Sequence, residues 1–375
     1  MTSTTSSRLR CLPGPGSCLL ALLWLVSVGI WAQDGSADDD ALTLNSDVKL
    51  PDNLWPPDKI VIPAPAIAVA APEPLPPPPV ESLTIMLDWF LSPQHAPLLV
   101  AKARELYLEQ GLEVTLKPPA DPSLPAKLLA AGEVDAALAR QPLLHLRDHD
   151  DDRLVRIATL MATPLNAVIV TGDARPEELD ALATLSYGYA TREGAELIVP
   201  LLVPGSVRQT DGYSAPLNVH YGSERHLQEG NIQIMADGFN HSLPAQLATD
   251  GINASVIPYT ELGLPAHDGL VLMINGNALR ARKDTWQRLT VALENAARWI
   301  ADDPARAWET LTEAYPVLDN SVNQAAWPAI VRRMALRPAA VDTRRYQRME
   351  AFLQERGITD TRLPARALAV DPHGL

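Results

Sequence analysis

Residues 83–116 read LTIMLDWFLSPQHAPLLVAKARELYLEQGLEVTL, and this stretch decides the fold class. Apolar residues alternate with their neighbours over residues 83–87, which predicts a half-buried β-strand. A helical pattern covers residues 96–110 and Gly111 ends it. A second strand is predicted over residues 112–116. The stretch is therefore a β-α-β unit, which is typical of a parallel sheet flanked by helices.

The same alternation of strands and helices continues along the chain. A short helix is predicted over residues 127–131 and a long one over residues 285–301, with long helices dominating from there to the C-terminus. Further strands are predicted at residues 134–139, 167–170, 185–189, 232–236 and 270–274. This order predicts a two-lobed α/β protein whose last segment returns to the first lobe. A ligand is then expected in the cleft, at the carboxyl ends of the strands.

Composition and charge narrow the class of function. The 375 residues are 47% hydrophobic and 20% charged, as is usual for a globular α/β protein. The net charge of −14 argues against a nucleic-acid partner, because phosphates are held by clustered Lys and Arg. Both cysteines, Cys11 and Cys18, lie in the first residues of the chain, so neither a disulfide nor a thiolate metal site is expected in the folded part.

The N-terminal residues predict export. Residues 1–32 read as a signal peptide or an N-terminal anchor, with Arg8 and Arg10 upstream of an apolar run at residues 19–32. Cleavage is favoured, because the run is short for a membrane span. Residues 33–81 are a proline-rich spacer, either a stalk that holds the domain away from a membrane or a solvated tail. The expected location is periplasmic or otherwise extracytoplasmic.

Several short motifs carry a family resemblance. Leu87-Asp88-Trp89, Pro93-Gln94-His95 and Glu109-Gln110-Gly111-Leu112 resemble the opening of the thiamine-pyrimidine superfamily. That superfamily joins bacterial periplasmic binding proteins for hydroxymethylpyrimidine or formylaminopyrimidine with fungal enzymes that make the pyrimidine. The motifs further along are Leu128-Leu129-Ala130-Ala131-Gly132-Glu133-Val134-Asp135, Pro164-Leu165-Asn166, Gly188-Tyr189, Ala236-Asp237, Asn240-His241 and Ala301-Asp302-Asp303-Pro304.

The resemblance implies the type 2 periplasmic-binding-protein fold. Residues 82–165 would form the first part of lobe 1, residues 166–258 lobe 2, and residues 259–375 the return segment and C-terminal helices of lobe 1. Hinge segments are expected near residues 165–171 and 255–268. Lobe closure around a ligand is the motion that such hinges permit.

Two candidate ligand contacts follow the first strand. Trp89 precedes a proline-containing loop, and the resemblance implies that its indole faces the pyrimidine, where it would stack on a flat ring. Capping of the sheet end is the alternative for Trp89. His95 would bond a ring nitrogen or cap local backbone groups, and both remain open. The superfamily usually carries Pro-Asn before this stretch, whereas this chain has Leu91-Ser92-Pro93-Gln94, so a different loop shape is expected.

Further candidates lie in the predicted second lobe. Glu196 follows Gly188-Tyr189 at a spacing that resembles an acidic residue of the superfamily, which would accept from an exocyclic amine, although a solvated helix residue would look the same. Tyr187 and Tyr189 share one strand face, where they would wall the pocket or pack in the core. Asn166 begins the first crossover between lobes, as a contact or as a turn residue.

Asn240 and His241 complete the predicted set of ligand contacts. They follow the strand at residues 232–236, where the second lobe approaches the ligand, although Ser242 stands where the superfamily commonly places an acid. The predicted ligand-binding residues are thus Trp89, His95, Asn166, Tyr187, Tyr189, Glu196, Asn240 and His241.

A dense His/Asp cluster runs from His145 to Asp152. His145 and His149 would share a helical face and could bind a metal ion. A solvated loop is the preferred interpretation, because no third ligand accompanies them at a regular spacing. No metal or cofactor is therefore expected.

Three functions remain open. The preferred one is the solute-binding component of an ABC importer, a monomer with a pyrimidine-like ligand and an inner-membrane permease as its partners. The alternative is a membrane-tethered sensor or partner module of the same fold. A synthase is least favoured, because the fungal enzymes carry a lysine just after the third strand and cysteines in their second half. This chain has Arg140-Gln141-Pro142 after the third strand and no cysteine beyond Cys18.

Overall fold

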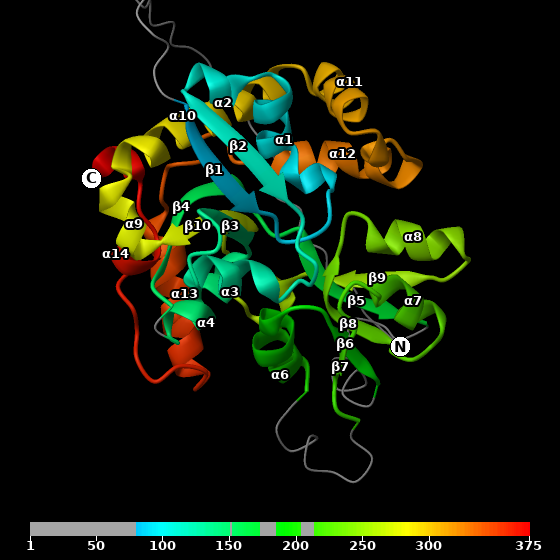
Figure 1. Cartoon of the computed structure of the whole chain (residues 1–375). Coiled ribbons are helices and arrows are strands. Elements are labelled where there is room, and N and C mark those ends of the chain that lie inside the picture. The colour runs from blue at the N-terminus through cyan, green and yellow to red at the C-terminus, as the bar shows by residue number, and fades with distance from the viewer. Residues whose placement is uncertain (1–79, 151, 173–184, 204–213) are drawn as a thin grey trace, which may run out of the picture. The chain divides into compact units, whose positions relative to one another are not determined.

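The computed structural model describes residues 80–150, 152–172, 185–203 and 214–375. These residues form one compact unit with two five-stranded sheets, one for each lobe (Figure 1). The predicted signal or anchor segment lies outside the described residues, as does the spacer up to residue 79. Within the described part, no helix is both long and apolar enough to cross a membrane.

The first lobe is built on a sheet with the order β2-β1-β3-β10-β4. Its strands are β1 (Glu81–Met86), β2 (Leu112–Lys117), β3 (Ala136–Ala139), β4 (Leu154–Met161) and β10 (Leu270–Asn275). The parallel pairing predicted from the β-α-β pattern is confirmed for β1 with β2 and with β3. Strand β10 is antiparallel to β3 and β4, because the chain re-enters this lobe from the cleft side after the second lobe.

The second lobe is built on a sheet with the order β7-β6-β8-β5-β9. Its strands are β5 (Asn166–Thr171), β6 (Tyr187–Tyr189), β7 (Leu217–Asn218), β8 (Ile234–Phe239) and β9 (Ala254–Ile257). Strand β6 is parallel to β7 and β8, whereas β5 is antiparallel to β8 and β9. These strands run from Asn166 at the start of β5 to Ile257 at the end of β9.

Two chain segments cross between the lobes. Residues 162–165 lead from β4 to β5, and residues 258–269 lead back from β9 to β10. The return crossing ends against the first one: the Gly269 amide donates to the carbonyl of Met161, the last residue of β4, at 2.8 Å. A Cβ atom at Gly269 would lie 2.2 Å from the Thr163 carbonyl oxygen, so the contact requires glycine.

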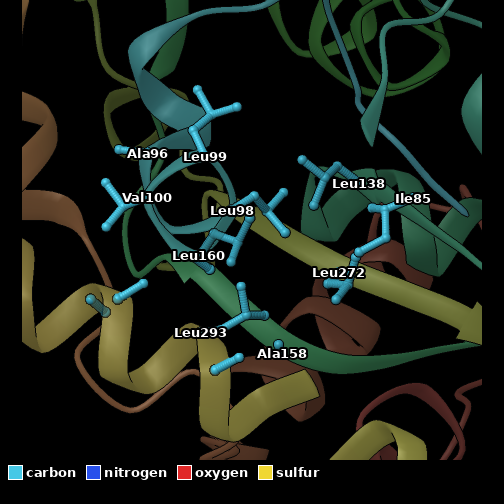
Figure 2. Close-up of a cluster of buried hydrophobic side chains, with 14 of the residues drawn as sticks. Ile85, Ala96, Leu98, Leu99, Val100, Leu138, Ala158, Leu160, Leu272 and Leu293 are labelled. Carbon is cyan, nitrogen blue, oxygen red and sulfur yellow. The ribbon is translucent and has the colours of Figure 1, made fainter. Parts of the chain in front are cut away.

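Helices cover both faces of the first sheet. Figure 2 shows that Leu98 of α1 lies beside Leu138 and Leu160 of the strands. The helices of the first lobe are α1 (Ala96–Ala103), α2 (Leu106–Glu109), α3 (Leu124–Ala130), α4 (Gln141–Asp148), α9 (Gly276–Ala281), α10 (Lys283–Asp302), α11 (Pro304–Ala314), α12 (Ser321–Arg333), α13 (Thr343–Glu355) and α14 (Ala365–Leu368). Helices α1 and α10 pack against one face of the first sheet, and α3, α4 and α14 pack against the opposite face.

Shorter helices accompany the second sheet. They are the π-helix η2 (Gly194–Ile198), α6 (Val199–Leu202), α7 (Ser223–Gln228), α8 (Leu243–Thr249) and the 3-10 helix η4 (Tyr259–Leu262). The core of this lobe also contains Met349, Phe352 and Leu353 of α13. Helix α13 therefore contacts both lobes, because its Tyr346 packs in the first lobe.

The structure differs from the sequence-based expectations in two elements of the first lobe. The helix predicted over residues 96–110 is broken between α1 and α2, where Glu105 has φ +57°. The left-handed conformation of Glu105 changes the direction of the chain before α2, so that Leu106 and Tyr107 are buried in the core. Strand β4 was not predicted, because Arg156 interrupts its apolar run; the buried guanidinium is satisfied by the carbonyls of Pro338, Ala339 and Ala340.

Truncating Leu98 to alanine is expected to lower the free energy of unfolding by about 2–5 kcal/mol, because it leaves a cavity in the core between α1 and the sheet. Leu98 is fully buried, whereas Leu108 of the neighbouring α2 is 52% exposed. Leu108→Ala is the matched control and should cost less than about 1 kcal/mol. Denaturant unfolding of both variants measures the difference, and equal losses would contradict this account of the core.

Candidate functional site

Polar and aromatic residues follow the strands of both lobes at the ends that meet. Asp88 and Trp89 follow β1, Arg140 follows β3, and Glu193 lies just after β6. An ion pair between Arg140 Nη1 and Glu193 Oε1, 3.1 Å long, shows that the strand ends of the two lobes face each other. The candidate site is therefore the interface between the lobes, as the fold class predicts.

Arg140 is the centre of a buried polar network. Its Nε donates to Asn166 Oδ1 at 2.9 Å, and its Nη2 lies 3.7 Å from Asp88 Oδ2. Burial lowers the pKa of Arg140, but Glu193, Asp88 and Asp237 outweigh it, so the pKa is raised and the guanidinium stays charged. The guanidinium also lies over the Phe239 ring, with Cζ 5.3 Å from the ring centroid. The guanidinium thus contacts groups from both lobes.

Asp88 is held as a carboxylate by His95. The His95 Nδ1 accepts the Ser92 backbone N–H at 3.2 Å, which leaves a proton on Nε2 to donate to Asp88 Oδ1 at 2.9 Å. Burial raises the pKa of Asp88, but the hydrogen bond from His95 and the charge of Arg140 outweigh it and lower the pKa. Of the two roles left open for His95, the structure shows the local backbone cap, and His95 reaches the network through Asp88.

Asp237 fixes the segment that carries Glu193. Its carboxylate accepts the backbone N–H groups of Ala190 at 3.0 Å and Thr191 at 2.8 Å, and also the Thr191 hydroxyl. A Cβ atom at Gly194 would lie 2.6 Å from Asp237 Oδ2, so glycine is needed for this approach. The buried Glu193 Oε2 has no hydrogen-bond partner among the described residues. Burial raises the pKa of Glu193, against the opposing charge of Arg140.

An aromatic cleft of about 390 Å³ opens beside this network. The Trp89 ring lies 4.6 Å from Tyr221 and 5.2 Å from Phe239, centroid to centroid, and Phe90 reaches the rim, half exposed. Polar side chains that line the cleft include Ser92, Ser223, Ser242, Gln246, Asn320 and Asn323. An apolar slot with a few convergent polar groups is the usual form of a small-molecule site.

His241 lines the same cleft. Its ring packs edge-on against Phe239 at 5.4 Å, and its Nδ1 is buried without a hydrogen-bond partner in the described part of the chain. Burial lowers the pKa of His241 to about 4, so the imidazole is neutral at neutral pH. A neutral imidazole has one donor and one acceptor nitrogen, and Nδ1 is the nitrogen left without a partner.

A second pocket of about 250 Å³ opens between α3 and α4 of the first lobe and the start of η2 in the second. Tyr189 and Glu196 line it, together with Lys127, Arg147 and Arg192. Glu196 is exposed and pairs with Arg192 at 2.8 Å, and Arg192 also pairs with Asp150 of the first lobe. The cations of this pocket are thus largely neutralised by neighbouring carboxylates.

The structure brings only part of the predicted set together. Trp89 and His241 line the aromatic cleft, and Asn166 belongs to the Arg140 network. Tyr189 and Glu196 line the second pocket, Tyr187 is buried in the core of the second lobe, and Asn240 donates its backbone N–H to the Leu165 carbonyl.

Four buried charged residues were missing from the predicted set: Asp88, Arg140, Glu193 and Asp237. A charged residue directly after a predicted strand was the available signal for Asp88 and Arg140. Glu193 lies one helical turn before Glu196.

The His145–Asp152 cluster is not the solvated loop that the sequence favoured. Residues up to Asp148 belong to α4, and His145 is fully buried, bonded to Glu350 of α13. Glu350 is distant in sequence, so no local pattern could reveal this partner. Across the described residues, no three His, Cys, Asp or Glu side chains are arranged to hold a metal ion.

Comparisons with known proteins place the chain in a family. Residues 92–307 match the family described as NMT1/THI5 like. The chain is 30% identical to a Haemophilus influenzae protein named for thiamine biosynthesis, over 78% of this chain and 92% of that protein. It is 25% identical to the formylaminopyrimidine-binding protein of Halalkalibacterium halodurans, over 67% of this chain and 74% of that protein. A pyrimidine phosphate synthase of Saccharomyces cerevisiae is 22% identical, over 65% of this chain and 74% of that enzyme.

A solved structure agrees on the fold. The alkanesulfonate-binding protein of Xanthomonas axonopodis pv. citri superposes with a TM-score of 0.58, over 77% of this chain and 98% of that protein, at 15% identity. That likeness extends to the fold alone. The chain therefore belongs to the NMT1/THI5-like family and has the type 2 periplasmic-binding-protein fold.

Proposed function

We propose that this protein is the exported solute-binding component of an ABC importer, and that its solute is a thiamine-precursor pyrimidine or a similar small heterocycle. The family, the fold and a relative named as a formylaminopyrimidine-binding protein support a solute-binding role. The observation that carries the proposal is the position of Trp89, which lies between an aromatic cleft and a buried network of charges from both lobes.

The two parts of the site suit the two parts of an aminopyrimidine. The flat ring would pack against Trp89 and Tyr221, which supply a large apolar contact area. The amine and ring nitrogens would bond to the network, where the free Glu193 Oε2 is an acceptor. Affinity would then come from desolvation of the ring, and specificity from polar groups that are left unpaired by a wrong solute.

Binding requires the lobes to separate at the network. The cavity beside Arg140, Asn166 and Glu193 is only about 10 Å³, which is room for about one water molecule. A heterocycle therefore enters only after the Arg140–Glu193 pair parts. The solute amine would replace Arg140 as the partner of one Glu193 oxygen, and closure would bury the ring. This is the hinge closure proposed for the transport cycle, with a permease as the partner of the closed form.

Binding without catalysis is part of the same proposal. The residue after β3 is Arg140, where the resemblance implies a lysine just after the third strand in the synthases. A guanidinium stays protonated and does not serve as a nucleophile toward a carbonyl. Arg140 is also occupied by Glu193, Asn166 and Asp88, which suits a recognition role.

Trp89→Phe is expected to weaken pyrimidine binding by about tenfold, which is about 1.4 kcal/mol, because the smaller ring loses stacking area. Trp299→Phe is the control, since Trp299 lies on α10 in contact with Arg104 and outside the cleft. Titration calorimetry of the full chain with hydroxymethylpyrimidine and formylaminopyrimidine measures both. Equal affinities for the Trp89 and Trp299 variants would remove Trp89 from the site.

Glu193 and Glu196 offer a matched pair that locates the acidic contact. Glu193→Gln should weaken pyrimidine binding by at least about tenfold, because charged hydrogen bonds are worth about 1.5–3 kcal/mol. Glu196→Gln should leave the affinity unchanged, since that carboxylate is exposed and paired with Arg192. Thermal shift with increasing pyrimidine gives both affinities. A larger loss with Glu196→Gln would move the ligand to the second pocket.

A further inference from the structure

We propose that Gln141 is a positioning residue that couples Arg140 to the return crossing between the lobes, and that His145 fixes the orientation of the Gln141 amide. The inference rests on the proposed function in one respect only, namely that Arg140 contacts the solute. The coupling itself is carried by a buried chain of hydrogen bonds that runs from α4 to the crossing and to α13.

Gln141 joins the helix that follows Arg140 to the crossing. It is the first residue of α4 and is fully buried. Its Oε1 accepts the backbone N–H of Asp268 at 2.7 Å, and its Nε2 lies 3.1 Å from His145 Nε2. Asp268 belongs to the crossing at residues 258–269, so one side-chain amide connects the start of α4 to the segment that must move if the lobes separate.

His145 determines which way the Gln141 amide points. Its Nδ1 lies 2.5 Å from Glu350 Oε1, and a carboxylate can only accept, so Nδ1 carries the proton. The Nε2 of this neutral imidazole is then an acceptor, and it takes a hydrogen bond from Gln141 Nε2. That leaves Gln141 Oε1 facing the Asp268 N–H. A turned amide would place two acceptors opposite each other at His145 and two donors opposite each other at Asp268.

Asp268 is anchored to both neighbouring elements. Its Oδ2 accepts the Thr159 hydroxyl of β4 at 2.8 Å and the Tyr346 hydroxyl of α13 at 3.1 Å, and its Oδ1 accepts from Arg345 at 2.7 Å. Helix α13 in turn contributes Met349 and Leu353 to the core of the second lobe. The Gln141 amide therefore lies where the first lobe, the crossing and the helix shared by both lobes come together.

Titratable groups from several elements lie near His145. They are Glu350 and Tyr346 of α13, Asp148 and His149 at the C-terminal end of α4, and His267 and Asp268 of the crossing. Burial lowers the pKa of His145 below its ordinary value of 6.5, in spite of Glu350. The stabilisation that comes from the neutral ring is thus fully present above pH 6.5 and is lost as the pH falls through the folded-state pKa.

Protonation breaks the arrangement at one defined atom. A proton on His145 Nε2 would face the Gln141 NH₂ group, and two donors cannot bond. The amide must then turn or move away, and the Asp268 N–H loses its acceptor. The coupling between Arg140 and the crossing is expected to operate at neutral pH and to fail in acid.

Hydrogen exchange tests the chain without any ligand. In the full-length protein, exchange at the Asp268 amide is followed by mass spectrometry while the His145 ring is titrated by NMR. Exchange is corrected for its intrinsic pH dependence. Protection of Asp268 should fall by about fivefold or more over the pH range in which His145 gains its proton, since losing a hydrogen bond worth about 1 kcal/mol or more makes opening of the amide easier. Protection that does not change across this titration would overturn the proposal.

The Gln141→Glu variant distinguishes the hydrogen-bonding role of the Gln141 side chain from its contribution to packing. A carboxylate at this position accepts from Asp268 N–H and from protonated His145 Nε2 together, so the pKa of His145 should rise and Asp268 should stay protected in acid. Gln141→Met, which keeps the volume, should lose the protection at all pH values. Gln347→Met on exposed α13 surface is the control and should match the wild type. A Gln141→Glu protein with wild-type pH dependence would contradict the assigned orientation.

Measurements of solute affinity test the coupling of Gln141 to the solute site separately from the identity of the solute. If the wild type binds a pyrimidine, Gln141→Met should weaken binding by about three- to tenfold, because Arg140 is no longer tied to the crossing. An unchanged affinity would overturn the coupling to the site. A wild type that binds none of the pyrimidines refutes the proposed solute alone, and the exchange data still decide the proposal about Gln141 and His145.

Discussion

The interface between the lobes depends on burying one positive charge. Arg140 lies at the end of β3 with little access to solvent, and an unpaired charge in such a place would cost several kcal/mol. Three different elements supply its partners: the loop after β1 supplies Asp88, β5 supplies Asn166, and the segment after β6 supplies Glu193. Two of these belong to the second lobe, so the two sheets must meet at this point to satisfy the guanidinium.

The same charge organises the aromatic side of the site. Arg140 lies over the Phe239 ring, and the Phe239 and Trp89 rings form a T-shaped pair at an interplanar angle of 76°. A cation over a ring and an edge-to-face pair both fix ring orientation. The cleft thus has a defined wall before any solute arrives. The carboxylates of the buried network are also held in place, because His95 bonds to Asp88 and two backbone amides bond to Asp237.

Local sequence patterns revealed the fold better than the site. Alternation and helix ends located β1, β2 and α10, because those signals lie within a few residues. The break at Glu105 and the strand around Arg156 were missed, since a left-handed turn and a guanidinium bonded to residues 338–340 depend on tertiary contacts. In the site, Trp89 and His241 were found by their place after strands. Glu193 was not predicted, although the structure places it in the Arg140 network and places Glu196 in the second pocket; their positions depend on how Gly194 packs against Asp237.

The close contact between the two crossings has a consequence for how the sequence can vary. Gly269 approaches the Thr163 carbonyl so closely that any other residue would push the crossings apart. This requirement has nothing to do with the solute, since it concerns two backbones that must pass at one point. The residues of the cleft can therefore change to suit a new ligand while position 269 stays glycine. Among related proteins that bind different solutes, position 269 should be among the last to vary, because it reflects the contact between the two crossings and not the identity of the solute.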